Sequence, residues 1–434
     1  MSAVILTSSP RSTRGILLKR HRYFTLLLLI PLVSLVASSV LIAADWPQFL
    51  GPSRDGRTAA EGLAEEWPAE GPRVLWKVSV GMAFSGPVVV GDRVFVVHRK
   101  GNEEVVQCLE AATGKQVWRF ASPTSYKDSF GFNNGPWATP TVHGSHVFVL
   151  GAGGVLTCLE KSSGNRTWTV DTRAKFSVKD RFFGDACSPL VEGDLVILNV
   201  GAEDGAGVVA FKVSDGSVAW KSSDHEASYS TPVVKSVGGK RKAFFFTREG
   251  LLVLDSTNGA VESEFPWRAR IHASVNAATP LVDGHRVFIS TSYGVGATLL
   301  ELRDGKVETV WKSKDALTNH YATSVRHGAH LYGYHGRQEY GPDLRCIDFA
   351  TGKPTWTEKR FGGGSVLVAG DYLLLLAESG KLTLARAIPQ KFAPLASASI
   401  LAPTVRAYPA FANGRLYARN GDTLVCVDLR NPGP

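Results

Sequence analysis

Ala111-Ala112-Thr113-Gly114-Lys115-Gln116-Val117-Trp118 is the stretch that decides the fold, because variants of it recur along the chain. In each close variant a Trp follows the turn Gly by four residues. These variants are Ser163-Gly164-Asn165-Arg166-Thr167-Trp168, Asp215-Gly216-Ser217-Val218-Ala219-Trp220 and Thr351-Gly352-Lys353-Pro354-Thr355-Trp356, and looser copies run from Gly259 to Trp267 and from Gly305 to Trp311. A repeat of this kind indicates an array of similar units.

Each unit has the pattern of a four-stranded antiparallel meander, with short alternating strands joined by Gly-centred turns. In the first unit we expect strands at 85–89, 94–97 and 105–109, followed by the strand that carries Trp118. Eight such openings occur about every 42 to 53 residues, and no helical periodicity interrupts them. Strand-only repeats of this size predict an all-β fold, a single eight-bladed β-propeller of four-stranded antiparallel blades.

The two ends of the repeat array are expected to meet in one blade. The eighth unit ends near Asp428 without a fourth strand, whereas the strand-like segment 74–80 precedes the first unit without earlier strands. Strand 74–80 is therefore predicted to complete the last blade, which closes the ring and covers its sheet edges. Seven blades plus a cap is the alternative, because unit seven, 365–398, lacks the Thr-Gly-Trp motif.

The repeated Trp and four of the five cysteines are interpreted as structural residues. A Trp at this position can pack between neighbouring blades and donate its indole N–H to a backbone carbonyl. Cys108, Cys158, Cys346 and Cys426 share one strand position, and equivalent positions lie on separate sheets that a disulfide could not join. All five cysteines, including the separate Cys187, are therefore expected to be free thiols.

Residues 1–44 are expected to be a targeting segment. They carry five of the nine net positive charges and no acid, and an uncharged run from Tyr23 to Ala44 follows the basic stretch. This order is typical of a signal peptide cleaved after Ala44, with an uncleaved membrane anchor as the competing interpretation. The protein is thus expected to be exported, either periplasmic or extracellular. Residues 45–73 are predicted to be an irregular lead-in packed on the fold's surface, before a propeller at 74–430.

Two motifs resemble a known family. The Asp/Glu-x-x-Thr-Gly-Lys-x-x-Trp unit at Glu110–Trp118 and Asp348–Trp356 resembles the tryptophan-docking repeat of quinoprotein-type propellers, a group with both PQQ-dependent alcohol dehydrogenases and the non-catalytic BamB. The opening Asp45-Trp46-Pro47-Gln48-Phe49-Leu50-Gly51-Pro52-Ser53-Arg54-Asp55-Gly56 is similar to that of exported PQQ-like repeat proteins of planctomycete-type bacteria. The resemblance implies the propeller fold over essentially 45–431.

Candidate ligand residues lie on the loops that lead from one blade to the next, because these loops surround one mouth of a propeller's channel. They are Asn133, Asn134, Trp137, Arg181, Asp185, His225, Glu226, Tyr229, His272, Asn276, Asn319, His320, Tyr321, Arg360, Arg406 and Tyr408. The histidines could converge on a metal or an anion. Their unequal offsets before the opening strands weigh against a shared ion, so no metal is expected. The competing interpretation is that these are solvated or backbone-bonding loop residues.

A second candidate surface is the long loop of unit six, where His335, Arg337 and Tyr340 have the composition of an interface hot spot. Loop decoration without a partner is the alternative. Together these features favour a non-catalytic binding or scaffolding propeller with an envelope protein, extended polysaccharide or peptide as partner. No nucleic acid partner is expected from the mild charge, and membrane contact is expected only through an uncleaved N-terminal segment. We expect a monomer.

The alternative function is a PQQ-dependent alcohol dehydrogenase with Ca²⁺. Resemblance to those enzymes would imply a vicinal cysteine pair, a Trp stacked on the quinone and a calcium held by Glu, Asn and Asp. No two cysteines are adjacent, and no Cys-x-x-Cys-His haem site is present. No cofactor is therefore expected, and PQQ belongs only to the alternative.

Overall fold

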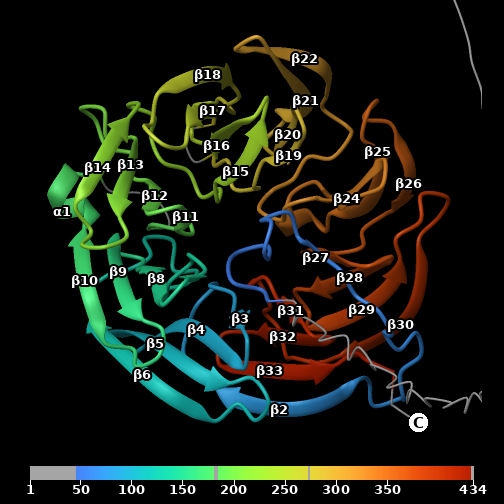
Figure 1. Ribbon diagram of the computed structural model, residues 1–434. Helices are drawn as coiled ribbons and strands as arrows, with labels where there is room; N and C mark the ends of the chain where they lie inside the picture. The colour runs from blue at the N-terminus through green and yellow to red at the C-terminus, as the bar shows by residue number, and fades with distance from the viewer. Residues whose placement is uncertain (1–44, 180–183, 272–273, 432–434) are drawn as a thin grey trace, which may run out of the picture. The chain divides into compact units, whose positions relative to one another are not determined.

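Eight antiparallel sheets form a ring in the computed structural model, which describes residues 45–179, 184–271 and 274–431 (Figure 1). The expected eight-bladed propeller is confirmed, and seven blades plus a cap is wrong, because the sheet of unit seven is complete without the Trp motif. In Figure 1 the first strands β3 (Val88–Val90), β11 (Leu190–Glu192), β27 (Gly364–Ala369) and β31 (Ala410–Ala412) lie on the inner side of their blades. Among the described residues, helix is confined to α1 (Thr172–Phe176) and the 3₁₀ turn η1 (Gln338–Tyr340).

The first four blades follow the chain without a break. They are β3 (Val88–Val90), β4 (Arg93–Lys100), β5 (Glu103–Glu110) and β6 (Gln116–Pro123); β7 (Thr141–His143), β8 (His146–Leu150), β9 (Val155–Glu160) and β10 (Arg166–Asp171); β11 (Leu190–Glu192), β12 (Leu195–Asn199), β13 (Val208–Lys212) and β14 (Val218–Ser222); β15 (Val233–Val237), β16 (Lys240–Phe246), β17 (Gly250–Asp255) and β18 (Val261–Pro266).

The last four blades include the closure of the ring. They are β19 (Leu281–Asp283), β20 (Arg286–Thr291), β21 (Gly296–Arg303) and β22 (Lys306–Ser313); β23 (Val325–His327), β24 (His330–His335), β25 (Asp343–Asp348) and β26 (Pro354–Glu358); β27 (Gly364–Ala369), β28 (Tyr372–Ala377), β29 (Lys381–Arg386) and β30 (Ala393–Ser399); β31 (Ala410–Ala412), β32 (Arg415–Arg419), β33 (Thr423–Asp428) and β2 (Arg73–Ser79). As predicted, the early strand β2 pairs antiparallel with β33, the last strand of the chain.

Neighbouring blades are joined where an indole lies on a turn glycine. The Trp118 indole N–H donates to the Lys161 carbonyl at 2.9 Å, and a Cβ on Gly164 would stand 2.5 Å from the Trp118 ring. Equivalent hydrogen bonds join Trp76 to Ala111, Trp168 to Val213 and Trp311 to Phe349, each with a turn glycine against the ring. Glycine is required at this position for two reasons: the backbone has a positive φ, and the absence of a side chain leaves space for the indole.

The repeated cysteine lies beside this contact. Cys108 stands opposite Trp118 on the neighbouring strand, and Cys158, Cys346 and Cys426 stand opposite Trp168, Trp356 and Trp76. All five cysteines are free and buried, as expected. Burial raises the pKa of Cys108 to about 12, so that this thiol stays protonated and acts as a small apolar side chain.

Blade four makes the contact differently. The position four residues after Gly259 is Ser263, whose hydroxyl donates to the Gly305 carbonyl at 2.7 Å. Trp267, which ends the looser sequence copy, follows β18, and its indole N–H has no hydrogen-bond partner in the described part of the chain. Trp267 is therefore not equivalent to Trp118, and Gly305 has no neighbour within 4 Å of a built Cβ.

The lead-in does not pack on the surface as expected, because its first part fills the centre of the ring (Figure 1). We call residues 45–58 the central segment. Trp46 forms an antiparallel bridge with Val89 of β3, and the segment leaves as β1 (Arg57–Thr58), parallel to β27. Trp46 and Leu50 are almost completely buried. Apolar burial draws the segment inward, where it occupies space that the inner strands alone leave unfilled.

Arg54 ties the central segment to three blades. Its buried guanidinium donates to the carbonyl oxygens of Pro189 and Pro232 and to Thr141 Oγ1, and its Nε donates to Gln48 Oε1 at 2.7 Å. Burial lowers the pKa of Arg54 to about 10, so the side chain remains a cation at neutral pH. Its acceptors are neutral oxygens from blades two, three and four, which makes Arg54 a hub at the centre of the ring.

Alanine at the turn glycine is expected to weaken a blade contact. Gly164 (φ +74°) and Gly305 (φ +75°) have the same backbone strain for alanine, but only at Gly164 would the methyl group meet an indole. We expect Gly164→Ala to lose about 1–3 kcal/mol more unfolding free energy than Gly305→Ala, measured by urea denaturation. Equal losses would show that backbone conformation alone selects glycine.

Removal of the central arginine is expected to destabilise the ring. Arg54→Ala leaves buried carbonyls of two blades without a donor, which should cost at least about 2 kcal/mol of unfolding free energy. The matched control is Arg57→Ala, three residues away, where an exposed arginine that pairs with Asp55 should contribute less than about 1 kcal/mol. Similar denaturation midpoints for the two variants would contradict the hub role.

Candidate ligand-binding mouth

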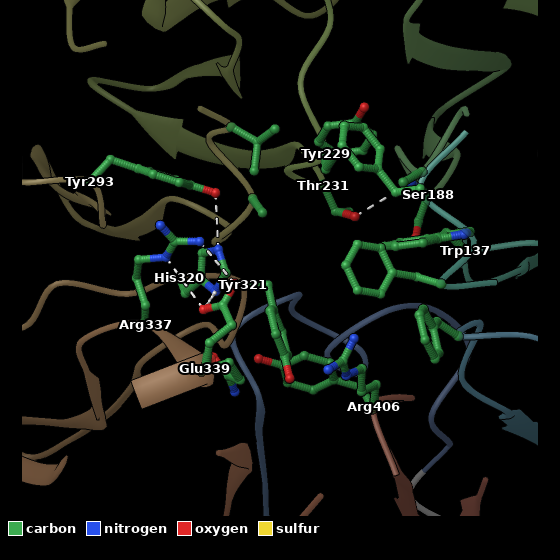
Figure 2. A pocket seen from close by; sticks show the side chains of 18 of the residues that line it. Trp137, Ser188, Tyr229, Thr231, Tyr293, His320, Tyr321, Arg337, Glu339 and Arg406 are labelled. Carbon is green, nitrogen blue, oxygen red and sulfur yellow. Dashed lines mark hydrogen bonds and ion pairs between the residues drawn. The ribbon is translucent and has the colours of Figure 1, made fainter. Parts of the chain in front are cut away.

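Loops that lead from the outer strand of one blade to the inner strand of the next surround a cavity of about 410 Å³ at one end of the ring. We call it the mouth cavity. Its lining residues are Phe49, Phe84, Phe130, Phe132, Trp137, Ala186, Ser188, Tyr229, Thr231, Ile271, Val275, Ala277, Tyr293, His320, Tyr321, Arg337, Gln338, Glu339, Arg406 and Tyr408. Figure 2 shows side chains from several blades converging on this space.

The central segment closes the inner end of the mouth cavity. The rings of Phe49 and Tyr408 meet edge to face at 4.9 Å, and the hydroxyl of Tyr408 accepts a hydrogen bond from the Thr323 backbone N–H. Phe49 directly precedes Leu50, which is almost fully buried, and Arg54 fills the centre further on. The cavity is therefore blind, with a floor built from the lead-in.

Aromatic rings form much of the wall and the rim. Phe84 and Trp137 pack edge to face at 4.8 Å, and Phe130 stacks with Phe132 at 6.4 Å. Phe130 and Phe132 are 51% and 56% exposed, and Ile271, also on the lining, is 54% exposed. Large apolar side chains that remain exposed together at a concave site are a feature of binding surfaces.

A polar cluster from blades five and six forms another part of the wall (Figure 2). The Tyr293 hydroxyl lies 2.9 Å from His320 Nε2, and His320 Nδ1 lies 3.8 Å from Glu339. Arg337 donates to Glu339 at 2.9 Å and places its guanidinium 5.0 Å from the Tyr293 ring centre. Tyr293 also has a positive φ of 63°, an uncommon conformation for a residue other than glycine.

Burial keeps the imidazole of this cluster neutral. It lowers the pKa of His320 to about 4, although the carboxylate of Glu339 acts in the opposite direction. A neutral imidazole can accept the hydrogen bond of Tyr293 at Nε2 and carry its proton on Nδ1, which faces Glu339. Burial likewise raises the pKa of Tyr293, so its phenol stays protonated and is not an activated nucleophile.

The structure brings part of the predicted set together at the mouth cavity. Trp137, Tyr229, His320, Tyr321, Arg406 and Tyr408 all line it. Glu226 instead lines a second cavity of about 520 Å³ beside blades three and four, where it pairs with Arg248 at 2.9 Å. His225 Nδ1 lies 2.9 Å from Thr247 Oγ1, away from the mouth lining. Arg181 and His272 lie outside the described residues.

Other predicted residues hold loop backbone in place. Asn276 donates to the carbonyls of Thr247 and Trp267, and Asn319 donates to the Tyr334 carbonyl. Asp185 instead pairs with the Arg173 side chain, and the exposed Arg360 donates only its own backbone N–H, to Asp343. Asn133 accepts from Gly135 N and Asn134 accepts from Asp128 N, so all four asparagines contact loop backbone. These are the backbone-bonding roles that the competing interpretation described.

The long loop of unit six divides between the mouth and the surface. Arg337 lines the mouth cavity, whereas Tyr340 is 76% exposed and lies outside that lining. His335 faces Thr318 and stands 3.5 Å from Asp315, also outside the lining. The Arg337 guanidinium nevertheless lies 5.6 Å from the Tyr340 ring centre, so these two side chains adjoin each other at the edge of the mouth.

The residues at the mouth do not fit a calcium–quinone site. Ca²⁺ takes six to eight oxygen ligands with several carboxylates. Among the described residues, Glu339 is the single carboxylate of the mouth lining, and it is paired with Arg337. Within the described ranges, no group of three or more His, Cys, Asp or Glu side chains is placed to hold a metal ion.

The sequence did not identify several of the residues that line the mouth cavity. Phe49 lies in the lead-in, which was expected on the surface, and Tyr293 lies in a hairpin of blade five rather than on a crossing loop. Phe130 and Phe132 had a usable signal, since two large aromatics flank a glycine in an otherwise polar loop. Glu339 is placed by the 3₁₀ turn of a long loop, which local sequence does not orient.

Acid is expected to destabilise the mouth through His320. The pKa of His320 is about 4 in the folded protein, below its value near 6.5 in the unfolded chain. The contribution of this residue to the free energy of unfolding is therefore fully present above pH 6.5 and is lost as pH falls toward 4. We expect a loss of roughly 2–3 kcal/mol from this residue over that range. Thermal melts from pH 7 to pH 4.5 should show a smaller decline for His320→Gln than for the native chain. Tyr293→Phe, which keeps the imidazole, should retain the steep decline; equal slopes in all three proteins would contradict this assignment.

Comparisons with known proteins agree with the propeller. A family model described as outer membrane protein assembly factor BamB matches residues 58–125 and 102–358. Outer membrane protein assembly factor BamB of Burkholderia pseudomallei (strain K96243) is 31% identical over 188 residues, which are 42% of this chain and 41% of that protein. The chain thus spans about two fifths of the length of this curated relative.

Two solved structures are similar in fold. BamB from Moraxella catarrhalis has a TM-score of 0.61 at 15% identity, over 83% of this chain and 99% of that one. The computationally designed protein Ika8 has a TM-score of 0.54 at 11% identity, over 84% and 100% of the two chains. At these identities the likeness concerns the fold alone.

Proposed function

The chain belongs to the PQQ-like β-propeller family described as outer membrane protein assembly factor BamB, and from this premise we propose that it is an exported, non-catalytic binding propeller. It holds an extended polypeptide segment of another envelope protein at the mouth cavity. The observation that carries this proposal is the aromatic mouth itself, a blind cavity of about 410 Å³ with exposed Phe130, Phe132 and Ile271 at its edge.

The chemistry of the lining favours a polypeptide ligand. Aromatic and aliphatic side chains with a few arginines are the composition of protein interface hot spots. The lining hydroxyls of Ser188, Thr231, Tyr293 and Tyr408 already form hydrogen bonds within the protein, which disfavours the dense hydrogen bonding that a polysaccharide requires. A rigid ring loses little conformational entropy when it receives a flexible segment, which supports a scaffolding role.

Several observations favour binding over catalysis. Burial raises the pKa values of Tyr293 and of Cys108, Cys158, Cys346 and Cys426, which keeps these potential nucleophiles protonated. Glu339, the one carboxylate among the described lining residues, is held by Arg337. Export fits the printed name of the relative, which places that protein's work at the outer membrane. Within the described residues, no helix is long and apolar enough to cross a membrane.

Site-specific cross-linking in cells tests the proposal. A photoreactive phenylalanine analogue at Phe132 should form adducts with extended segments of exported proteins, identified by mass spectrometry. The matched control is Val261, which is 48% exposed on the outer strand β18 and lies away from the mouth lining. In a binding assay with the captured segment, Phe132→Ala or Tyr321→Ala should cost about 1 kcal/mol or more, as expected for hot-spot residues.

Two outcomes would overturn the proposal. Equal adduct yields at Phe132 and Val261, or adducts with polysaccharide alone, would remove the polypeptide ligand. The dehydrogenase alternative predicts that the purified chain mixed with PQQ and Ca²⁺ gains cofactor absorbance and oxidises alcohols with a dye as acceptor. A positive result in that assay would replace the binding function with an enzymatic one.

A further inference from the structure

Arg406 is a cation in the wall of the mouth cavity that forms an ion pair with Glu378 through one edge of its guanidinium. Its Nε lies 3.2 Å from Glu378 Oε1, whereas its terminal nitrogens donate to no residue that the structure describes. The guanidinium instead lies 5.6–6.0 Å from the ring centres of Phe84, Phe132 and Tyr321. Figure 2 shows its nitrogens directed into the cavity.

Two other arginines in the interior of the ring donate hydrogen bonds to backbone carbonyls. Arg419 is fully buried and donates to the backbone carbonyls of Val97, Gly81 and Asn420, and Arg54 donates to carbonyls at the centre. A guanidinium has five N–H donors in a fixed fork that matches the two oxygens of a carboxylate. The terminal edge of Arg406 therefore presents donors for which the protein itself supplies no acceptor among the described residues.

The shape of the cavity selects the part of a polypeptide that can reach Arg406. Phe49 and Tyr408 form the floor, and the buried Leu50 and Arg54 occupy the centre of the ring further on. A polypeptide cannot pass through this blind space. A chain end can enter it with its last side chain against the aromatic wall, within a volume typical of small-ligand pockets.

We propose that the mouth cavity binds the carboxyl-terminal end of a polypeptide whose last residue is apolar or aromatic. The terminal carboxylate accepts hydrogen bonds from the terminal nitrogens of Arg406, while the last side chain packs against Phe132 and Trp137. Charge-assisted bonds in this aromatic, partly dry setting are stronger than neutral ones. The proposal rests on the function proposed above and specifies which part of the partner occupies the cavity.

Three fluorescein-labelled decapeptides, of which the first two share one sequence and the third differs at one position, test the proposal by fluorescence anisotropy with the purified full chain. The first ends in phenylalanine with a free carboxylate, the second is its C-terminal amide, and the third is the amide with a glutamate before the phenylalanine. We expect the first to bind at least about tenfold more tightly than the second, as a charged hydrogen bond implies. The third should bind like the second, because an acidic side chain does not replace the chain end.

The matched variants are Arg406→Gln and Arg386→Gln. Arg386, on β29 outside the cavity lining, also pairs with a glutamate, Glu65, and lies 4.7 Å from the ring centre of Tyr372. Arg406→Gln should bring the first two peptides to within about a factor of two of each other, whereas Arg386→Gln should keep the native difference. Circular dichroism melts establish that both variants are folded.

The outcomes separate the two proposals. Equal binding of acid and amide by the native chain overturns chain-end recognition and leaves the binding propeller in place. Binding of the third peptide as tight as the first overturns the chain-end assignment, because an acidic side chain then suffices. Absence of binding by all three peptides, together with absence of cross-linking at Phe132, overturns the proposed function itself. Because the acid and amide are compared on the native chain, the test does not depend on the stability of a variant.

Discussion

The indole that lies on a glycine of the next blade is the contact on which the ring depends. A four-stranded blade cannot bury both of its faces alone, and the Trp118–Gly164 contact shows how two faces come together without a gap. The indole supplies a large apolar surface and one donor, the turn supplies a carbonyl, and the missing side chain supplies the space. Cys108 opposite Trp118 completes the arrangement with a small buried side chain.

The ring built from these contacts leaves a central space, and the chain fills it with its own lead-in. Arg54 satisfies carbonyls of two blades that converge on the centre, and Leu50 adds apolar burial. The central segment also turns the channel mouth into a blind cavity with Phe49 in its floor, so any ligand must enter and leave by the same side.

The chemistry of the molecule is concentrated where the blades differ. The repeated positions carry tryptophan, glycine and cysteine, and these residues pack within and between the blades. The loops at the mouth carry the neutral His320, the Arg337–Glu339 pair and Arg406 with its partner Glu378, brought together from different blades. A repeat fold thus separates the residues that hold it together from the residues that meet a ligand.

The sequence by itself determined the eight units, their strands and the closure by β2, because the turn glycines, the period-two alternation and the spaced tryptophans are local signals. It also indicated which loops meet at the mouth, including His320 and Arg406. Only the tertiary structure decided that Asn276 and Asn319 hold backbone, and that Phe49 and Tyr293 reach the cavity. It likewise moved the lead-in from the surface to the centre. The reason is physical: side-chain direction in an irregular loop, and the burial of an irregular segment, depend on neighbours that lie far away along the chain.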